Sequence, residues 1–161
     1  MDLRLLYALI LTVLPVSELR GGLPLAIIYA KDNNISVALV FFLVVILNIL
    51  VIFFIFYFLD NLHHVFMRFR PYRRLFEVYL KRFQKKVDRF EKRHEEIGFL
   101  ALMLFVGVPL PGTGAWAGCL VSWLLGLDRK KSILAISAGV VIAGVLILLG
   151  TLGVIGFFGL G

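Results

Sequence analysis

Four uncharged runs of apolar residues constrain this chain more than any other feature. They cover 5–17, 33–59, 97–127 and 132–161, and hydrophobic residues make up 61% of the 161 residues. A helix needs about 20 apolar residues to cross a hydrocarbon core roughly 30 Å thick. The runs therefore predict an all-α integral membrane protein, and they leave no room for a separate catalytic domain.

Two of the runs are continuous enough to span the bilayer. The run 33–59 holds 27 uncharged residues rich in Val, Ile, Leu and Phe. At about 1.5 Å per residue, it crosses the bilayer with some tilt. The run 132–161 is also long enough. We expect one transmembrane helix in each of them.

The other two runs are broken, and each predicts a re-entrant hairpin. The run 5–17 measures only about 20 Å as a helix, and a second short helix is expected to begin near Pro24. The segment 107–114 interrupts the run 97–127 with two prolines and three glycines, which cannot continue a helix. Helices are expected at 98–106 and 115–126.

The two halves share one order of elements, which predicts an inverted repeat. Pro15 aligns with Pro109 at an offset of 94, and Ser36 aligns with Ser132 at an offset of 96. If each hairpin returns to its own face and each long helix crosses once, the halves have opposite orientations. Interrupted segments at corresponding positions of two halves point to a transporter binding site. One membrane domain is expected, with halves 1–59 and 98–161 and a connector 60–97.

The distribution of basic residues predicts the orientation. Of 17 Lys and Arg residues, 11 lie in 60–96 and three in 128–131, which the hairpin topology places on one face. Basic loops face the cytoplasm. We therefore expect a multi-pass cell-membrane protein with a cytoplasmic connector. The net charge of +7 is explained by anionic lipid headgroups rather than by nucleic acid.

The connector has the pattern of a basic amphipathic helix. Phe69, Phe76, Phe83, Phe90 and Ile97 recur every seven residues, with basic residues on the other faces. This pattern predicts a helix on anionic lipid; a coiled-coil or homodimer contact is the alternative. The residues expected at the membrane surface are Arg73, Arg74, Phe76, Phe83, Lys85, Lys86 and Phe90.

The two hairpin tips hold the residues most suited to a function. Ionisable groups at membrane depth are costly and usually functional, and helix N-termini favour anions. Arg20 with two half-helix N-termini would form an anion pocket for a phosphate headgroup, and Glu18 would be a proton-coupled gate or the resting counter-ion of Arg20. The expected substrate-binding or coupling residues are Glu18, Arg20, Gly21, Gly22, Pro24, Pro109, Pro111, Gly112, Thr113 and Gly114.

Structural roles are the alternatives for several polar residues. A Glu18–Arg20 pair would hold the loop without any ligand, and the hydroxyls of Ser17 and Thr113 would bind a ligand or cap a helix. Asn48 is expected to form a hydrogen bond between helices, and Cys119 to pack as a small buried residue. Trp123 is expected to anchor its helix at the membrane interface, and Trp116 is expected to pack inside the protein.

The segments 17–24 and 108–116 together resemble the family described as putative small multidrug export protein, which is similar to the DedA/VTT (SNARE-associated) membrane proteins. The resemblance covers nearly the whole chain and implies two facing re-entrant hairpins. DedA/VTT proteins are associated with moving phospholipids or polyprenyl phosphate carriers between leaflets, some with proton coupling. The resemblance matches Glu18 to the acidic residue of their first hairpin. Unlike them, this chain has no arginine in 107–116, and Arg20 is expected to substitute.

Three functions follow as hypotheses. The first is a translocase of a lipid or lipid-phosphate carrier, the second a proton-coupled exporter of small cationic drugs, and the third a membrane scaffold that acts through the connector. The sequence contains no nucleophile–base pair or metal-ligand spacing, so we expect no enzymatic activity, metal or cofactor. The expected partners are anionic lipids, with protons and a lipid phosphate for a transporter.

Overall fold

The computed structural model describes residues 3–15, 17–61, 78, 95–110 and 112–157. The regular elements within these residues are all α-helices. Four are short and two are long: α1 (Leu3–Val13), α2 (Glu18–Asp32), α3 (Val37–Asn61), α6 (Glu95–Gly107), α7 (Ala115–Leu124) and α8 (Arg129–Phe157). The expected amphipathic connector and its surface residues lie outside the described residues, as does Pro111.

The two long helices are the two predicted membrane crossings. α3 has 25 residues and α8 has 29, and both are apolar enough to span a bilayer. Each begins at a polar cap, because Ser36 Oγ accepts from Leu39 N at 3.5 Å and Asp128 Oδ1 accepts from Lys131 N at 2.9 Å. The caps align Ser36 with Asp128, whereas the sequence alignment paired Ser36 with Ser132.

The four short helices form two pairs, each with a break in the middle. α6 and α7 lie close to their predicted bounds. The prediction for α2 was wrong, because the helix begins at Glu18 and includes Pro24 rather than beginning near it. A proline inside a helix removes one backbone hydrogen bond. The buried stripe of α2 at helical spacing outweighs that loss; it consists of Leu19, Leu23, Ala26, Ile27 and Ala30.

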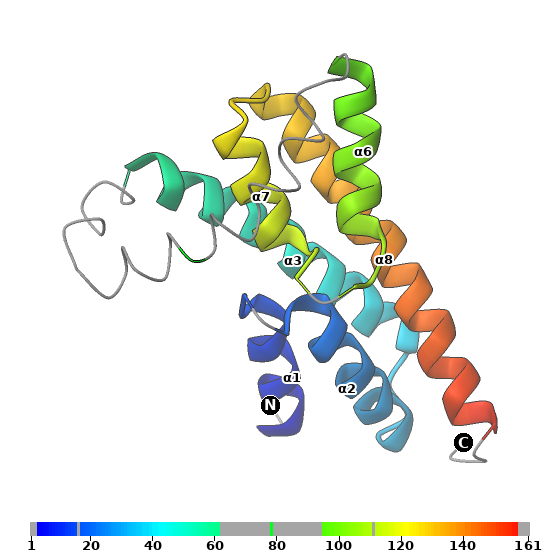
Figure 1. Cartoon of the computed structure of the whole chain (residues 1–161). Helices are drawn as coiled ribbons and strands as arrows, with labels where there is room; N and C mark the ends of the chain where they lie inside the picture. The colour runs from blue at the N-terminus through cyan, green and yellow to red at the C-terminus, as the bar shows by residue number, and fades with distance from the viewer. Residues whose placement is uncertain (1–2, 16, 62–77, 79–94, 111, 158–161) are drawn as a thin grey trace.

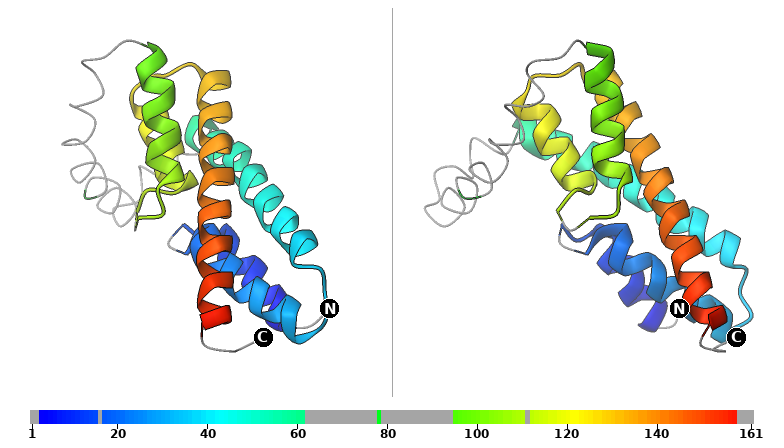
Figure 2. Two further views of the ribbon diagram at one scale, coloured as in Figure 1. Left: turned by 90° about the vertical axis from the view of Figure 1, so that its right-hand side faces the viewer. Right: turned by 45° about the vertical axis from the view of Figure 1, so that its right-hand side comes forward.

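The breaks of the two pairs meet in the middle of the molecule (Figures 1 and 2). The pair α1–α2 lies toward the end where α8 finishes, and the pair α6–α7 lies toward the end where α8 begins. α3 and α8 pack against both pairs. The long helices therefore form a frame that holds the two breaks against each other.

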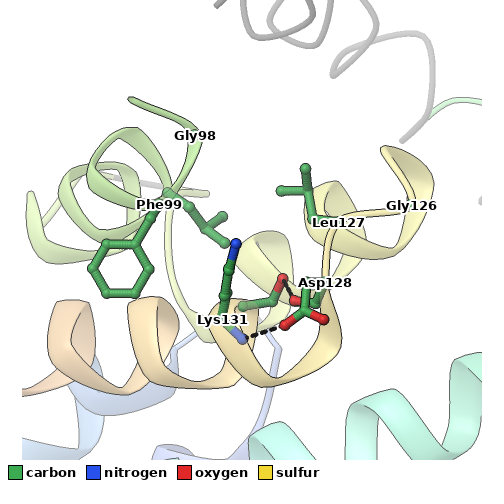
Figure 3. A pocket seen from close by; sticks show the side chains of 8 residues that line it. Gly98, Phe99, Gly126, Leu127, Asp128 and Lys131 are labelled. Atoms are coloured by element: carbon green, nitrogen blue, oxygen red, sulfur yellow. Dashed lines mark hydrogen bonds between the residues drawn. The ribbon is translucent and has the colours of Figure 1, made fainter. Parts of the chain in front are cut away.

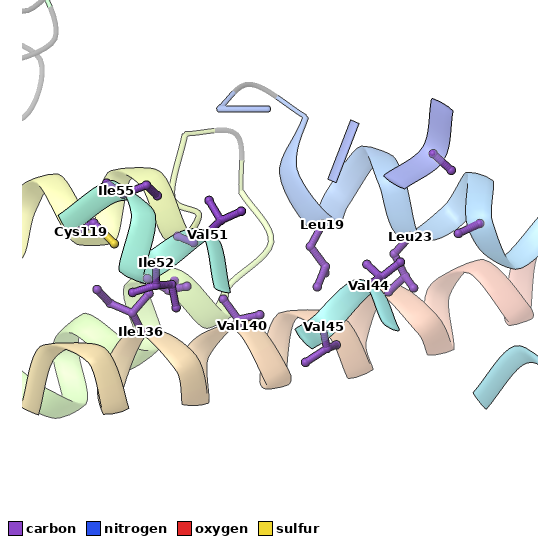
Figure 4. Packing of buried hydrophobic residues seen from close by; sticks show 14 of the residues in the cluster. Leu19, Leu23, Val44, Val45, Val51, Ile52, Ile55, Cys119, Ile136 and Val140 are labelled. Carbon is purple, nitrogen blue, oxygen red and sulfur yellow. The ribbon is translucent and has the colours of Figure 1, made fainter. Parts of the chain in front are cut away.

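A continuous apolar core joins α2, α3, α7 and α8 (Figure 4). Leu23, Ile52 and Ile136 are completely buried in it. Cys119 is buried in the same cluster, so its predicted packing role is confirmed. A Cβ added at Gly139 of α8 would lie 2.7 Å from the Met103 carbonyl oxygen in α6. Small residues thus let these helices approach closely, as is common between helices in membranes.

The outer faces of the long helices are also apolar. Phe42, Phe54 and Tyr57 of α3 are about three-fifths exposed, at 61%, 61% and 62%, and Leu134 and Leu149 of α8 are similarly exposed, at 63% and 62%. Large exposed apolar surfaces mark contacts with membranes or partners. The chain is apolar inside and outside along both long helices, as expected for helices in a bilayer.

Candidate functional site

The first break lies between α1 and α2. The hydroxyl of Ser17 donates to the carbonyl oxygen of Leu11 at 2.6 Å. Ser17 occupies the N-cap position of α2 without a side-chain capping bond. Glu18 follows with a φ of +47°, a conformation that is uncommon for residues other than glycine. Strained backbone of this kind is often found where a side chain has a functional position.

The second break runs from Val108 to Gly114 between α6 and α7. Gly112 adopts a φ of +77°, which a residue without Cβ tolerates. Thr113 Oγ1 lies 2.8 Å from the Val108 carbonyl oxygen and 2.9 Å from that of Leu110. Its single hydroxyl proton is therefore directed at carbonyls within the break. Gly114 is the N-cap of α7, so Thr113 does not cap that helix.

Arg20 extends from the first break to the second. Its guanidinium donates to Thr113 Oγ1 at 2.8 Å, to the Val108 carbonyl oxygen at 3.3 Å and to the Leu110 carbonyl oxygen. These carbonyls follow the C-terminus of α6, where a helix dipole favours a cation. One charged side chain thus binds three acceptors in the opposite break.

Glu18 contacts the other side of the same break. Its Oε1 accepts a hydrogen bond from the Trp116 backbone N–H at 3.1 Å, and its side chain is buried. The carboxylate lies at the N-terminus of α7, where a helix dipole favours an anion. A Cβ added at Gly114 would overlap the carboxylate. The close approach of Glu18 therefore requires glycine at position 114.

A side chain of α7 also binds the first pair of helices. Trp116 Nε1 donates to the Val13 carbonyl oxygen at the C-terminus of α1, at 3.1 Å. The neighbouring Thr12 carbonyl oxygen accepts from Asn48 Nδ2 at 2.9 Å. The predicted interhelical hydrogen bond of Asn48 is thereby confirmed. Side chains from α7 and α3 bind the last carbonyls of α1, which its own helix leaves unpaired.

The structure brings together only some of the predicted site residues. Glu18, Arg20, Thr113 and Gly114 meet where the two pairs of helices bind each other. We call this the crossed contact: Glu18 and Arg20 of α2 bind the second break and the start of α7, and Trp116 of α7 binds the end of α1. Gly22 instead packs α2 against α1, since an added Cβ would overlap Thr12 Oγ1. The others are placed elsewhere or only within a break: Gly21 lies against Ser17, Pro24 lines a groove beside α8, and Pro109 and Gly112 lie in the second break.

The space beside Glu18 is small in this conformation. The cavity lined by Glu18, Arg20, Asn48 and Gly114 measures about 10 Å³, which is about the room that one water needs. The position that the sequence offered to an anion at α7 is taken by the Glu18 carboxylate. The two breaks are therefore packed closely together, with room beside Glu18 for about one water.

A second polar cluster joins the ends of α3 and α7 to the start of α8. Asp60 Oδ1 accepts from Arg129 at 2.8 Å and from Trp123 Nε1 at 3.1 Å. The Arg129 guanidinium also lies 4.2 Å from the centre of the Phe56 ring. A hollow of about 130 Å³ between the start of α6 and the α7–α8 turn lies near this end (Figure 3).

The sequence did not predict the polar contacts of two residues, Trp116 and Asp60. Trp116 was expected only to pack, yet its indole N–H binds α1 across the interface. A partner for that N–H could have been expected, because tryptophan N–H groups usually find acceptors when buried. Asp60 was treated only as the start of the connector. The available signal was that Asp60 ends an apolar run on the same predicted face as the basic loop 128–131, so a carboxylate there could pair with a basic residue of that loop.

Comparison with known proteins gives one result. The chain matches no curated protein and no solved structure. Residues 18–146 match the model of a family described as "Putative small multi-drug export protein". The match begins at Glu18, directly after the first break, spans the second break and contains every residue of the crossed contact except Val13 and Thr12. With two helices long and apolar enough to cross a bilayer among the described residues, the chain is a membrane protein of this family.

Proposed function

We propose that the protein is a transporter in which two re-entrant hairpins, related as inverted repeats, form one gate at the middle of the bilayer. The observation that supports this proposal is the crossed contact. Arg20 of the first hairpin binds carbonyl oxygens in the break of the second hairpin. Trp116 of the second hairpin binds the Val13 carbonyl oxygen at the end of α1 in the first hairpin. Interrupted helices that meet near the midplane are typical of substrate sites in transporters.

The orientation of the gate follows from charge. The end with Asn61 and Arg129 is proposed to face the cytoplasm, because 14 of the 17 basic residues lie in 60–96 and 128–131. Irregular backbone at membrane depth is tolerated only where it is buried in protein or lines a water-filled cavity. The side chains of Arg20, Trp116 and Asn48 supply such partners in the closed state.

The first substrate class is a lipid or polyprenyl-phosphate carrier moved between leaflets. An anionic headgroup would compete with the Glu18 carboxylate for the N-terminus of α7 and would pair with Arg20. Protonation of Glu18 would remove the charge that this helix end attracts. Uptake of a proton would thus release Glu18 and admit the anion, which couples transport to protons.

The second substrate class is a small cationic compound exported in exchange for protons. The family description favours it. Glu18 is a buried carboxylate, and it would bind either a proton or the cation. Arg20 would then serve only to hold the second break. The two classes differ in whether Arg20 contacts the substrate, and this difference can be measured.

Leaflet exchange in proteoliposomes tests the first class. The wild type should exchange a fluorescent phospholipid faster than protein-free liposomes and should respond to a pH gradient. Glu18→Gln should abolish that response, because its amide cannot take up the proton. Arg20→Gln should slow exchange about tenfold through the loss of charged hydrogen bonds. The matched control is Arg4→Gln, which removes the same charge at an exposed position and should exchange at the wild-type rate.

Proton release on addition of cationic compounds tests the second class. Release in detergent should depend on Glu18 and should persist in Arg20→Gln. If the wild type neither exchanges lipid nor releases protons with several cations, the transport proposal fails. The scaffold hypothesis for the connector would then lead, and a scrambled Phe76, Phe83 and Phe90 pattern would be the variant to examine.

A further inference from the structure

A lateral groove separates the second half of α2 from the last turns of α8. It measures about 560 Å³, which lies within the range of small-molecule sites. The two helices lie side by side here and run toward the same end of the molecule (Figures 1 and 2). The lining of the groove includes Pro24, Ile28, Lys31 and Asp32 on one face of α2, and Gly150 and Thr151 on α8.

The groove is apolar along most of its length, and its charged residues lie at one end. Its walls from Pro24 to Ile28 carry no charge, whereas Lys31 and Asp32 are adjacent, exposed and opposite in charge. The nine residues from Pro24 to Asp32 extend along about 12 Å of helix, eight steps of about 1.5 Å each. This length is close to half of a hydrocarbon core about 30 Å thick, so in the proposed topology the groove would follow one leaflet.

Gly150 provides the depth of the groove. A Cβ added at this position would meet no atom within 4 Å, so the space beside it is open. The hydroxyl of Thr151 donates to the Ile147 carbonyl oxygen at 2.7 Å. The hydroxyl hydrogen of Thr151 is therefore bonded within α8. The charged groups that line the groove are the side chains of Lys31 and Asp32.

We propose that this groove binds one acyl chain of a zwitterionic phospholipid, with the phosphate at Lys31 and the headgroup amine at Asp32. An acyl chain matches the uncharged walls, and a headgroup with one negative and one positive charge matches the adjacent pair. An anionic lipid would satisfy Lys31 but would be repelled by Asp32. The site is separate from the gate at Glu18, so it does not depend on transport; its place in one leaflet rests on the proposed topology.

Lipid retention measured by native mass spectrometry tests the tail site. The purified protein is released from detergent doped with dioleoyl phosphatidylethanolamine. Gly150→Leu fills the groove and should lower retention about tenfold. The matched control is Gly153→Leu, because an added Cβ there also meets open space while Gly153 does not line the groove. Retention in this control should equal the wild type, and equal loss in both variants would overturn the proposal.

Two further variants test the headgroup site. Lys31→Gln should weaken retention of both phosphatidylethanolamine and phosphatidylglycerol about two- to fivefold, the range of an exposed ion pair. Asp32→Asn should weaken only the former and so reduce the preference for the zwitterionic lipid. A wild type without headgroup preference would contradict the charge assignment.

The same spectra report a competing occupant. A wild-type dimer that Gly150→Leu dissociates, with Gly153→Leu unchanged, would assign the groove to a second copy of the chain and overturn the lipid proposal. Transport does not enter these measurements. Failure here therefore leaves the proposed gate untouched, and loss of transport in Glu18→Gln leaves the lipid site untouched.

Discussion

Gly114 is the residue on which the contact between the pair α1–α2 and the pair α6–α7 depends most directly. An added Cβ would overlap the Glu18 carboxylate, so Gly114→Ala must displace it from the N-terminus of α7. Overpacking and the loss of a charged hydrogen bond should together lower the free energy of unfolding by about 2 kcal/mol. Unfolding in mixed micelles by titration with sodium dodecyl sulfate measures this change.

A double-mutant cycle separates this contact from other effects of the alanine. In the Glu18→Ala background the obstructing carboxylate is absent, so Gly114→Ala should cost at least about 1 kcal/mol less than in the wild type. Gly98→Ala is the matched control, since an added Cβ there meets open space. Additive costs at positions 18 and 114 would argue against the described contact.

At the scale of elements, the crossing of α6 and α8 depends on Gly139. A Cβ at this position would lie 2.7 Å from both the Met103 carbonyl oxygen and Val106 Cβ. Backbone cannot yield as a flexible side chain does, so Gly139→Ala should separate the helices and cost about 1–3 kcal/mol. Thermal unfolding in detergent, followed by circular dichroism, measures the change.

The same substitution elsewhere on α8 should have the opposite sign. Gly150→Ala places a Cβ in open space, and alanine favours a helix over glycine by about 1 kcal/mol. This variant should be at least as stable as the wild type. If both variants lose stability equally, helix propensity or insertion rather than the α6–α8 crossing would be responsible, and the packing argument would be wrong.

At the scale of the whole molecule, the fold predicts that the two polar loops lie on opposite sides of the membrane. The turn after α2 lies near the end of α8, whereas the turn after α7 lies at its start (Figure 1). Single cysteines introduced as Asn33→Cys and Lys130→Cys should therefore react with a membrane-impermeant maleimide from outside and inside, respectively. Both positions are exposed.

The native cysteine makes this experiment simple. Cys119 is buried, and Cys119→Ser removes any residual labelling with little change in volume. Labelling of both introduced cysteines from one side would mean that one short pair of helices spans the bilayer. The proposed inverted repeat would then be wrong, and the groove between α2 and α8 would no longer follow one leaflet.

Local sequence patterns predicted the helix bounds well where contacts with other helices did not change them. The prolines and glycines of 107–114 located the second break, because such residues cannot continue a helix. The first break was placed too far along the chain. The pattern at Pro24 indicated a helix start, but burial of Leu19 and Leu23 against other helices extends α2 back to Glu18.

The sequence by itself determined the two long apolar helices, the two broken pairs and the place of Glu18 and Arg20 beside the first break. These depend on hydropathy, on proline and glycine, and on the cost of charge among apolar residues, all of which act within short segments. Only the tertiary structure decided what those charges bind. Arg20 and Thr113 are 93 residues apart, and Glu18 and Trp116 are 98 apart. Such pairings arise from the packing of α2, α7 and the long helices, and no local pattern encodes them.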